Sequence, residues 1–402
     1  MKNYGIRLVC IVLCIVLLLS LPISASGSDA LPAEETAPVQ AVPVEITAGA
    51  ISAESAVLTD PHGTALFEKN ADVRMPMAST TKIMTALTAL ELCGEDGLDR
   101  TVKIPKEAVG VEGSSVYLYE GEALTVRELL YAMLMESAND AAAAVAIVSS
   151  GSIAAFADAM NEKAAALGLK NTHFVNPHGL DDKAHYTTAK DLAALTAAAL
   201  ENPAFAEIVS TYKKEIPLRE TEGVRLLVNH NRLLKTCEGC IGVKTGYTMT
   251  AGRCLVSAAE RNGSTLICVT LSAPDDWNDH AALYNWGFSR FESVTLSEPG
   301  EQYAVLPVVG GETDAPDGIA SVPVGNGEGL TAVVLRGKAE ITKTVELPRF
   351  LYAPVEKGTC VGRVVYYDHG RYLGEVPLYA REDAALYEKP SLWKIFLGLF
   401  QK

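Results

Sequence analysis

The feature that most limits how this chain can fold is a long helical block set between strand-like segments. Alanine-rich helical patterns fill most of residues 95–205, and short apolar runs typical of strands come before and after that block. After Pro203 four strand-like runs follow, and Asn262-Gly263 between the last two is a type I′ hairpin signal. We therefore expect an antiparallel sheet, with a helix around residues 277–286 that packs on it.

Two local signals add elements to this outline. Residues 56–59 and 65–67 are short apolar runs joined by a turn sequence that contains proline and glycine, which predicts a β-hairpin. Further on, Thr125 and Glu128 form a capping box, so we expect a helix to start there and to run into Met135.

The amino-terminal end has the composition of an exported protein. In residues 1–26, Lys2 and Arg7 flank the start of an apolar run that ends in small residues, which predicts a secretory signal peptide. That run is short for a bilayer-spanning helix, so an uncleaved anchor is the less favoured alternative. Residues 27–48, rich in proline and alanine, predict a disordered lead-in. The formal net charge of -15 argues against nucleic acid as a partner.

The carboxy-terminal end divides into two parts. From about Val294 the chain becomes rich in valine, threonine, glycine and proline in short alternating runs, which predicts a small β-rich domain over residues 293–385. Residues 386–402 are predicted to form an amphipathic tail, because the apolar side chains of residues 392–400, including Trp393 and Phe396, fall on one arc of a helix. Such an amphipathic tail is suited to lie in a membrane surface, and the alternative is a terminal helix that docks on the protein itself.

A serine and a lysine three residues apart, Ser79 and Lys82, form the first chemical motif. The Thr/Ser run around them and the apolar spacing after them predict a helix that begins near Ser79, with cap-like side chains at its start. A deprotonated amine can take the proton of a neighbouring hydroxyl, and free N–H groups at a helix start favour an oxyanion. Ser79 is therefore a candidate nucleophile and Lys82 its base, although an N-cap serine beside a solvated lysine has the same spacing.

Two more motifs follow in a set order. A Ser-Ala-Asn segment at residues 137–139 lies between two predicted helices, and a Lys-Thr-Gly segment at residues 244–246 lies on a predicted strand. The three motifs together are a signature of penicillin-binding proteins and class A β-lactamases. On these motifs, and on longer matching segments, the chain resembles the low-molecular-mass penicillin-binding proteins that are serine D-alanyl-D-alanine carboxypeptidases. The matching segments are residues 77–87, 137–142, 171–180 and 242–248.

The resemblance implies an α+β penicillin-binding/serine β-lactamase-like fold, followed by the small all-β domain. An antiparallel sheet flanked by helices would pair with an all-helical subdomain, and residues 49–292 would form the catalytic domain. The active site would lie in the groove between sheet and helices. The protein would act on the outer face of the cytoplasmic membrane or in the cell wall.

The resemblance also implies roles for individual residues. Ser79 would attack the carbonyl of the penultimate D-alanine of a peptidoglycan stem peptide, and Lys82 would accept its proton. Ser137 would relay a proton to the leaving amine, and Asn139 would hold both Lys82 and the substrate backbone. The backbone N–H groups of Ser79 and Tyr247 would hold the oxyanion.

The strand motif is expected to bind the substrate. Lys244 would be the second cation that lowers the pKa of Lys82, and with Thr245 it would receive the terminal carboxylate. Gly246 would let the substrate lie as an added strand, and Arg253 either contacts the carboxylate or has a surface role. The implied partners are stem peptides ending in D-Ala-D-Ala and β-lactam inhibitors, with no cofactor or metal.

Three other functions share part of this pattern. A β-lactamase would need a Glu-x-x-Leu-Asn element to activate water, and residues 150–210 contain none. A DD-endopeptidase or transpeptidase acting on cross-links would differ only in its acceptor, so the sequence leaves it open. A catalytically idle wall-binding protein is disfavoured because all three motifs are intact.

Cysteine and histidine spacing gives little support to a metal site. Cys237 and Cys240 form a single C-x-x-C pair with no second pair to complete a zinc site, and disulfide pairing stays undecided. His173, His178 and His185 lie five and seven residues apart, which places no two of them on one helix turn. We expect turn or core roles for these histidines.

Overall fold

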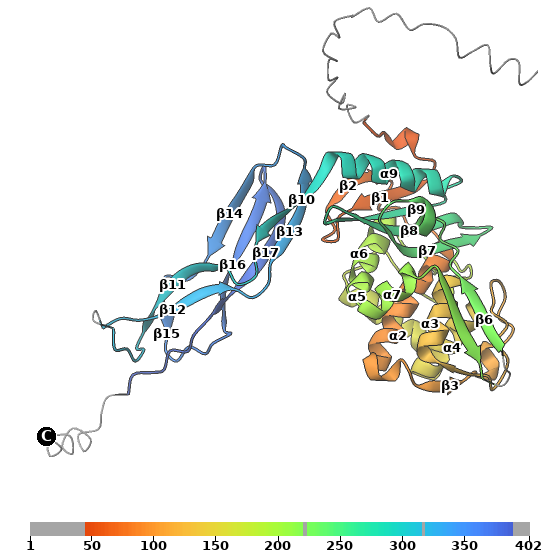
Figure 1. Ribbon diagram of the computed structural model, residues 1–402, viewed down its shortest axis with the longest axis horizontal. Helices are drawn as coiled ribbons and strands as arrows, with labels where there is room; N and C mark the ends of the chain where they lie inside the picture. The colour runs from red at the N-terminus through yellow and green to blue at the C-terminus, as the bar shows by residue number, and fades with distance from the viewer. Residues whose placement is uncertain (1–44, 220–222, 316–317, 389–402) are drawn as a thin grey trace, which may run out of the picture. The chain divides into compact units, whose positions relative to one another are not determined.

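The computed structural model describes residues 45–219, 223–315 and 318–388 (Figure 1). The predicted signal peptide, most of the lead-in and most of the amphipathic tail therefore lie outside the described residues. Within the described part no single helix is long and apolar enough to cross a membrane, although two bent helix pairs reach that length and composition together.

A five-stranded antiparallel sheet has the order β2-β1-β9-β8-β7. It pairs the first two strands of the catalytic part with three strands that follow the helical block. Its strands are β1 (Ser55–Thr59), β2 (Ala65–Lys69), β7 (Cys240–Thr248), β8 (Gly252–Arg261) and β9 (Ser264–Leu271). Both predicted hairpins are confirmed, and Asn262 and Gly263 have the positive φ angles that a type I′ turn requires. The order leaves β7, which carries the Lys-Thr-Gly motif, at one edge.

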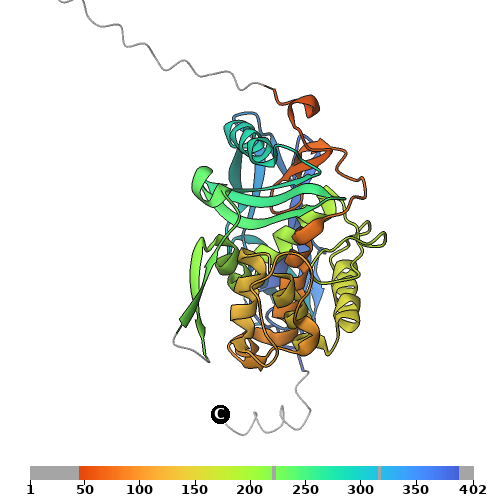
Figure 2. The ribbon, with the colours of Figure 1, turned by 90° about the vertical axis from the view of Figure 1, so that its right-hand side faces the viewer.

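Both faces of this sheet are covered, because side chains alternate along each strand. Val57 and Val256 belong to a core shared with the helical block, whereas Leu58 and Cys268 pack with Tyr284 of helix α9 (Asp276–Arg290). Figures 1 and 2 show α9 on one side of the sheet and the helical block on the other. The expected return of this last helix onto the sheet is confirmed.

The helical block contains most of the remaining elements of the catalytic part. Its helices are α2 (Lys82–Gly97), α3 (Val126–Met135), α4 (Asn139–Ser150), α5 (Ile153–Ala166), α6 (Ala189–Leu200) and α7 (Pro203–Ser210). Short elements fill the connections: η1 (Ala48–Ala50), η2 (Ala78–Thr81), η3 (Lys106–Ala108), α8 (Leu233–Thr236), the β3–β4 pair (Thr101–Lys103, Ala123–Thr125) and the β5–β6 pair (Lys213–Leu218, Gly223–Val228). The alanines of α4 are fully buried, so neighbouring helices approach this helix closely.

Helix starts agree with the sequence at one motif and differ at another. Thr125 and Glu128 make both hydrogen bonds of the predicted capping box at the start of α3. At Ser79 the chain first forms the 3₁₀ turn η2, and the α-helix begins at Lys82. The expected caps are wrong there, because the hydroxyls of Thr80 and Thr81 donate to the carbonyls of Met77 and Ala78 instead of accepting N–H groups.

The described residues from 291 onward form strands and loops, which confirms the predicted small all-β domain. Strand β10 (Phe291–Ser297) pairs with β13 (Leu330–Leu335). A six-stranded sheet has the order β14-β16-β17-β12-β11-β15. These strands are β11 (Gln302–Val309), β12 (Ala320–Asn326), β14 (Ile341–Glu346), β15 (Leu351–Tyr352), β16 (Cys360–Asp368) and β17 (Arg371–Ala380).

Candidate active site

The candidate nucleophile Ser79 lies in a tightly enclosed turn. Ala78, just before it, has a φ of 47°, a left-handed conformation that costs energy for a residue with a side chain. A Cβ on Gly246 would come 3.0 Å from the Ser79 nitrogen, and one on Gly179 would come 1.9 Å from the Ala78 oxygen. Because these two positions are glycines, strand β7 and the segment around Gly179 can both lie against the backbone at Ala78 and Ser79.

Lys82 is fully buried beside this serine. Its Nζ lies 2.9 Å from Ser79 Oγ, 2.7 Å from Asn139 Oδ1 and 2.6 Å from the His178 carbonyl oxygen. Burial, and then the positive charge of Lys244, lower the pKa of Lys82 well below its usual value, while Asp140 acts in the opposite direction. The amine thus loses its proton more easily than an exposed lysine, and its lone pair can then accept the Ser79 hydroxyl proton.

The Ser-Ala-Asn segment lies between α3 and α4, as the sequence predicts. Ser137 has a φ of 59° and Asn139 is the first residue of α4. The Asn139 side chain accepts a hydrogen bond from Lys82 but also donates one, at 2.6 Å, to the carbonyl oxygen of Glu112. One of the two N–H bonds of this amide therefore remains for the expected contact with the substrate backbone.

The Lys-Thr-Gly segment is buried on its inner side and open at the sheet edge. Lys244 is buried and donates a hydrogen bond to the Thr245 carbonyl oxygen, and burial lowers the pKa of its amine to about 7. Burial therefore makes this amine lose its proton more easily than an exposed lysine does. A bound carboxylate would favour the charged form.

A cavity of about 310 Å³ opens over this cluster. It is lined by Ser79, Ser114, Ser137, His230, Thr245, Gly246, Tyr247, Arg253, Asp276 and Trp277. The remaining predicted residues, Lys82, Asn139 and Lys244, are buried. The structure thus brings the three sequence motifs together around one cavity.

Arg253 lies in this cavity wall and is not a detached surface residue. Its guanidinium donates two hydrogen bonds to Asp276 Oδ1 and lies over the Trp277 ring. Both partners come from the start of α9, which the sequence did not link to the site. Ser114 and His230 were missed as well, because none of these four residues belongs to a recognisable motif.

The segment around the three histidines packs under the serine turn. His185 Nδ1 accepts a hydrogen bond from the Val175 N–H, so its Nε2 carries the proton and donates to Thr81 Oγ1 at 2.7 Å. Thr81 donates in turn to the Ala78 carbonyl at 2.7 Å. Burial lowers the pKa of His185 to about 4 and that of His178 to about 3, so both rings are neutral at pH 7.

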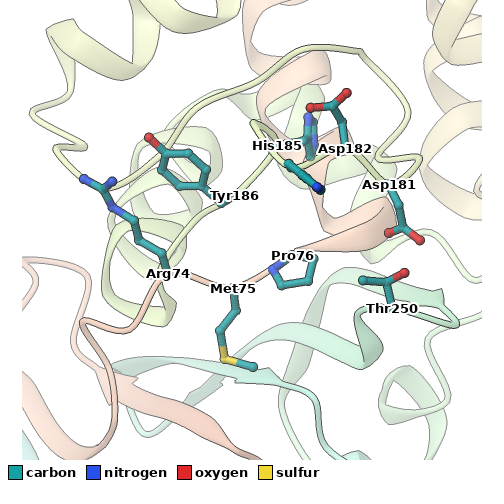
Figure 3. A pocket seen from close by; sticks show the side chains of 9 residues that line it. Arg74, Met75, Pro76, Asp181, Asp182, His185, Tyr186 and Thr250 are labelled. Atoms are coloured by element: carbon teal, nitrogen blue, oxygen red, sulfur yellow. The ribbon is translucent and has the colours of Figure 1, made fainter.

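A second cavity, of about 600 Å³, lies beside His185 (Figure 3). Arg74 and Tyr186 line one side of it, with the guanidinium over the tyrosine ring, and Asp181 and Thr250 line the other. Two of its charged groups already have protein partners, since Arg74 bonds Asn171 and Asp181 accepts a hydrogen bond from Thr248.

The described residues bear on two further features, metal binding and cysteine pairing. In these segments no three His, Cys, Asp or Glu side chains form a group able to hold a metal ion. The cysteines of the same segments, Cys237 and Cys240 included, are free thiols.

Comparison with known proteins gives a consistent result. A family model described as D-alanyl-D-alanine carboxypeptidase matches residues 40–275, and one described as penicillin-binding protein 5, C-terminal domain, matches residues 291–385. The chain is 34% identical over 342 residues to D-alanyl-D-alanine carboxypeptidase DacF of Bacillus subtilis, covering 82% of this chain and 85% of the relative. It is 32% identical over 354 residues to DacC of Escherichia coli, covering 84% and 86%.

A solved structure shares the whole architecture. Penicillin binding protein 5 from Haemophilus influenzae superposes with a TM-score of 0.71 at 29% identity, covering 85% of this chain and 100% of that one. Fold and site together define a serine peptidase of the penicillin-binding type. The chain belongs to the D-alanyl-D-alanine carboxypeptidase family.

Proposed function

We propose that this protein removes the terminal D-alanine from peptidoglycan stem peptides through an acyl-enzyme on Ser79. The observation that carries the proposal is the 2.9 Å contact between Ser79 Oγ and the buried amine of Lys82, at the floor of a cavity bordered by the edge strand β7. The family assignment supports the same reaction.

The acylation step uses both residues directly. The neutral Lys82 amine takes the hydroxyl proton as Ser79 Oγ bonds to the carbonyl carbon of the penultimate D-alanine. The backbone N–H groups of Ser79 and Tyr247 hold the resulting oxyanion. When the tetrahedral intermediate collapses, the C–N bond breaks and the proton passes through Ser137 to the amine of the departing D-alanine.

Deacylation repeats the chemistry with water. A water molecule gives a proton to Lys82 and attacks the acyl carbon, and the bond to Ser79 Oγ then breaks. Ser79 regains its proton, and the shortened peptide leaves with a new terminal carboxylate. A β-lactam acylates Ser79 in the same way, which makes a penicillin a covalent probe of the site.

Substrate binding follows from the free edge of β7. An extended peptide can pair with this edge as an added antiparallel strand. Gly246 lets the serine turn lie close against the same strand. Its terminal carboxylate then meets Thr245, Arg253 and the Lys244 amine, whose charged form the carboxylate favours. Asp276 holds Arg253 in position for this contact.

The test is to incubate the purified protein with a peptide ending in two D-alanines. We expect one free D-alanine per peptide and no joined product, whereas a joined product would favour the transpeptidase alternative. Ser79→Ala should abolish both D-alanine release and covalent labelling by a penicillin. Ser114→Ala, which removes another hydroxyl from the same cavity, should still be labelled, and labelling of the Ser79 variant would place the nucleophile elsewhere.

We also propose that the protein is exported and works at the outer face of the cytoplasmic membrane. The composition of residues 1–26 supports a signal peptide, and that of residues 386–402 supports attachment to the membrane surface. Residues 49–292 then form the catalytic domain, and residues 293–385 form the β-rich domain that separates it from the membrane. Membrane attachment through the tail would keep the active site near newly made wall.

A further inference from the structure

A group of exposed apolar side chains lies at one edge of the six-stranded sheet of the all-β domain. We define the β11–β15 patch as Val305, Val309, Phe350, Tyr352, Leu386 and Tyr387. Tyr352 and Tyr387 are 70% and 54% exposed, which is unusual for aromatic side chains with no partner chain to cover them. Figure 1 shows β11, β12 and β15 side by side at this part of the sheet.

Contacts link most members of the patch, and Val305 lies on the same exposed face of β11 as Val309. Val309 is the register partner of Tyr352 in the parallel β11–β15 pair, so their side chains share the outer face. The rings of Phe350 and Tyr352 have centroids 5.3 Å apart. Tyr387 donates its N–H to the Gly310 carbonyl oxygen at 2.8 Å, which places the last described residues beside the end of β11.

The patch adjoins the point where the tail begins. Leu392, the first residue of the apolar arc predicted in the tail, follows Tyr387 by five positions. Five residues span at most roughly 18 Å, so a tail lying in a bilayer surface holds Tyr387 within that distance of the surface. The patch is thereby brought to the headgroup region whenever the tail is bound.

We propose that the β11–β15 patch is a second membrane-contact surface, which inserts its aromatic and aliphatic side chains into the bilayer interface next to the tail. The inference rests on the proposed attachment of the tail. Tyrosine and phenylalanine favour this interface because their rings are apolar and the tyrosine hydroxyl stays hydrated. Binding to a membrane interface strengthens with the apolar area that is buried there, so a second contact strengthens attachment by the tail.

Charge near the patch indicates what kind of lipid contact this is. The exposed residues close to patch members in the sequence carry both signs of charge, with Glu312, Asp314 and Glu388 acidic and Arg349 basic, so they give the patch no excess of positive charge for anionic lipids. The contact is therefore apolar. We expect it to form on neutral lipid and to persist at high salt.

The experiment measures binding of the full-length mature chain to neutral phosphatidylcholine vesicles in 0.5 M salt. Val309→Ser with Tyr352→Ser should lower the partition coefficient at least about tenfold, because two apolar side chains no longer enter the interface. The matched control is Ile341→Ser with Val345→Ser, which removes two exposed apolar side chains from β14 at the opposite edge of the same sheet. That control should stay within about twofold of the unsubstituted chain.

Unchanged or stronger vesicle binding of the Val309/Tyr352 variant would overturn the proposal, and stronger binding would indicate that the tail docks on the patch. D-alanine release from a soluble peptide, measured on the same samples, verifies folding and separates this outcome from failure of the catalytic proposal. A second measurement, by fluorescence quenching, does not depend on a loss of binding. With Trp393→Phe as background, Tyr352→Trp should give fluorescence that brominated lipid quenches, and absence of this quenching contradicts insertion.

Discussion

At the scale of single residues, the pKa of Lys82 is the property on which the proposed chemistry depends. Its amine is fully buried, and the same burial brings it within hydrogen-bonding distance of three oxygen atoms. Those acceptors hold the amine in place, and Lys244 shifts it toward the neutral form. A lysine becomes a base near neutral pH only under such conditions.

Lys82→Ala tests this role. We expect the variant to bind penicillin but to be acylated at least a few hundredfold more slowly, since a general base contributes about that much. In the unsubstituted enzyme the acylation rate should rise with pH as the Lys82 amine deprotonates. Stopped-flow labelling across a pH series measures both effects, and a near-normal rate in the variant would assign the base to another group.

The buried histidines make stability depend on pH. Burial lowers the pKa of His185 to about 4 and those of His178 and His280 to about 3, below the ordinary value of 6.5. In the unfolded chain these histidines therefore take up protons near pH 6.5, whereas in the folded chain they do so only between about pH 4 and pH 3. Above pH 6.5 the histidines therefore do not lower the free energy of unfolding. As the pH falls from 6.5 toward 4, they lower it steadily.

Denaturant unfolding at pH 7 and at pH 4.5 measures this decrease. His185→Gln retains an amide that can still donate to Thr81 but does not titrate, so we expect it to lower the pH dependence of the free energy of unfolding. The surface histidine variant His62→Gln is the control, because His62 is exposed in the β1–β2 turn. An identical slope for both variants would show that His185 does not contribute.

At the scale of elements, the serine turn η2 is held by segments far away in the sequence. Gly246 on β7 and Gly179 in the histidine segment both approach its backbone, and His185 fixes it through Thr81. The left-handed conformation of Ala78 is maintained by these contacts.

Gly179→Ala should therefore disturb the site strongly. A Cβ there would lie 1.9 Å from the Ala78 oxygen, so the turn or the histidine segment must move. We expect penicillin acylation to fall at least about a hundredfold, because small displacements of a nucleophile have such effects. Gly63→Ala is the matched control, since Gly63 also has a positive φ but nothing within 4 Å of the added atom. It should lose only about 1 kcal/mol of stability and keep its acylation rate, and equal losses in both variants would point to backbone strain alone.

At the scale of the whole molecule, two β-rich regions have different tasks. The five-stranded sheet presents the edge to which we assign peptide binding, whereas the six-stranded sheet carries the surface that we assign to lipid. We propose that the signal peptide exports the chain and that the tail holds it at the membrane. Attachment thus depends on segments that take no part in the chemistry.

Deletion of residues 390–402 tests the attachment. We expect most of the D-alanine-releasing activity to move from the membrane fraction to the soluble fraction, because the patch alone gives only weak binding. The activity of the shortened chain on a soluble peptide should equal that of the full chain. Complete retention on membranes would assign anchoring to the signal segment or to the all-β domain alone.

The sequence by itself determined the motifs, the helical insert, two hairpins of the central sheet and the all-β domain. Those features are local: Asn262-Gly263 selects its turn, and Thr125 and Glu128 cap their helix, whatever surrounds them. Only the tertiary structure decided that Asp276 holds Arg253, that Glu112 occupies an N–H of Asn139, and that His185 reaches the serine turn through Thr81. These contacts join residues far apart in the chain, and no local preference encodes them, because long-range contacts form only when the packed core brings their segments together.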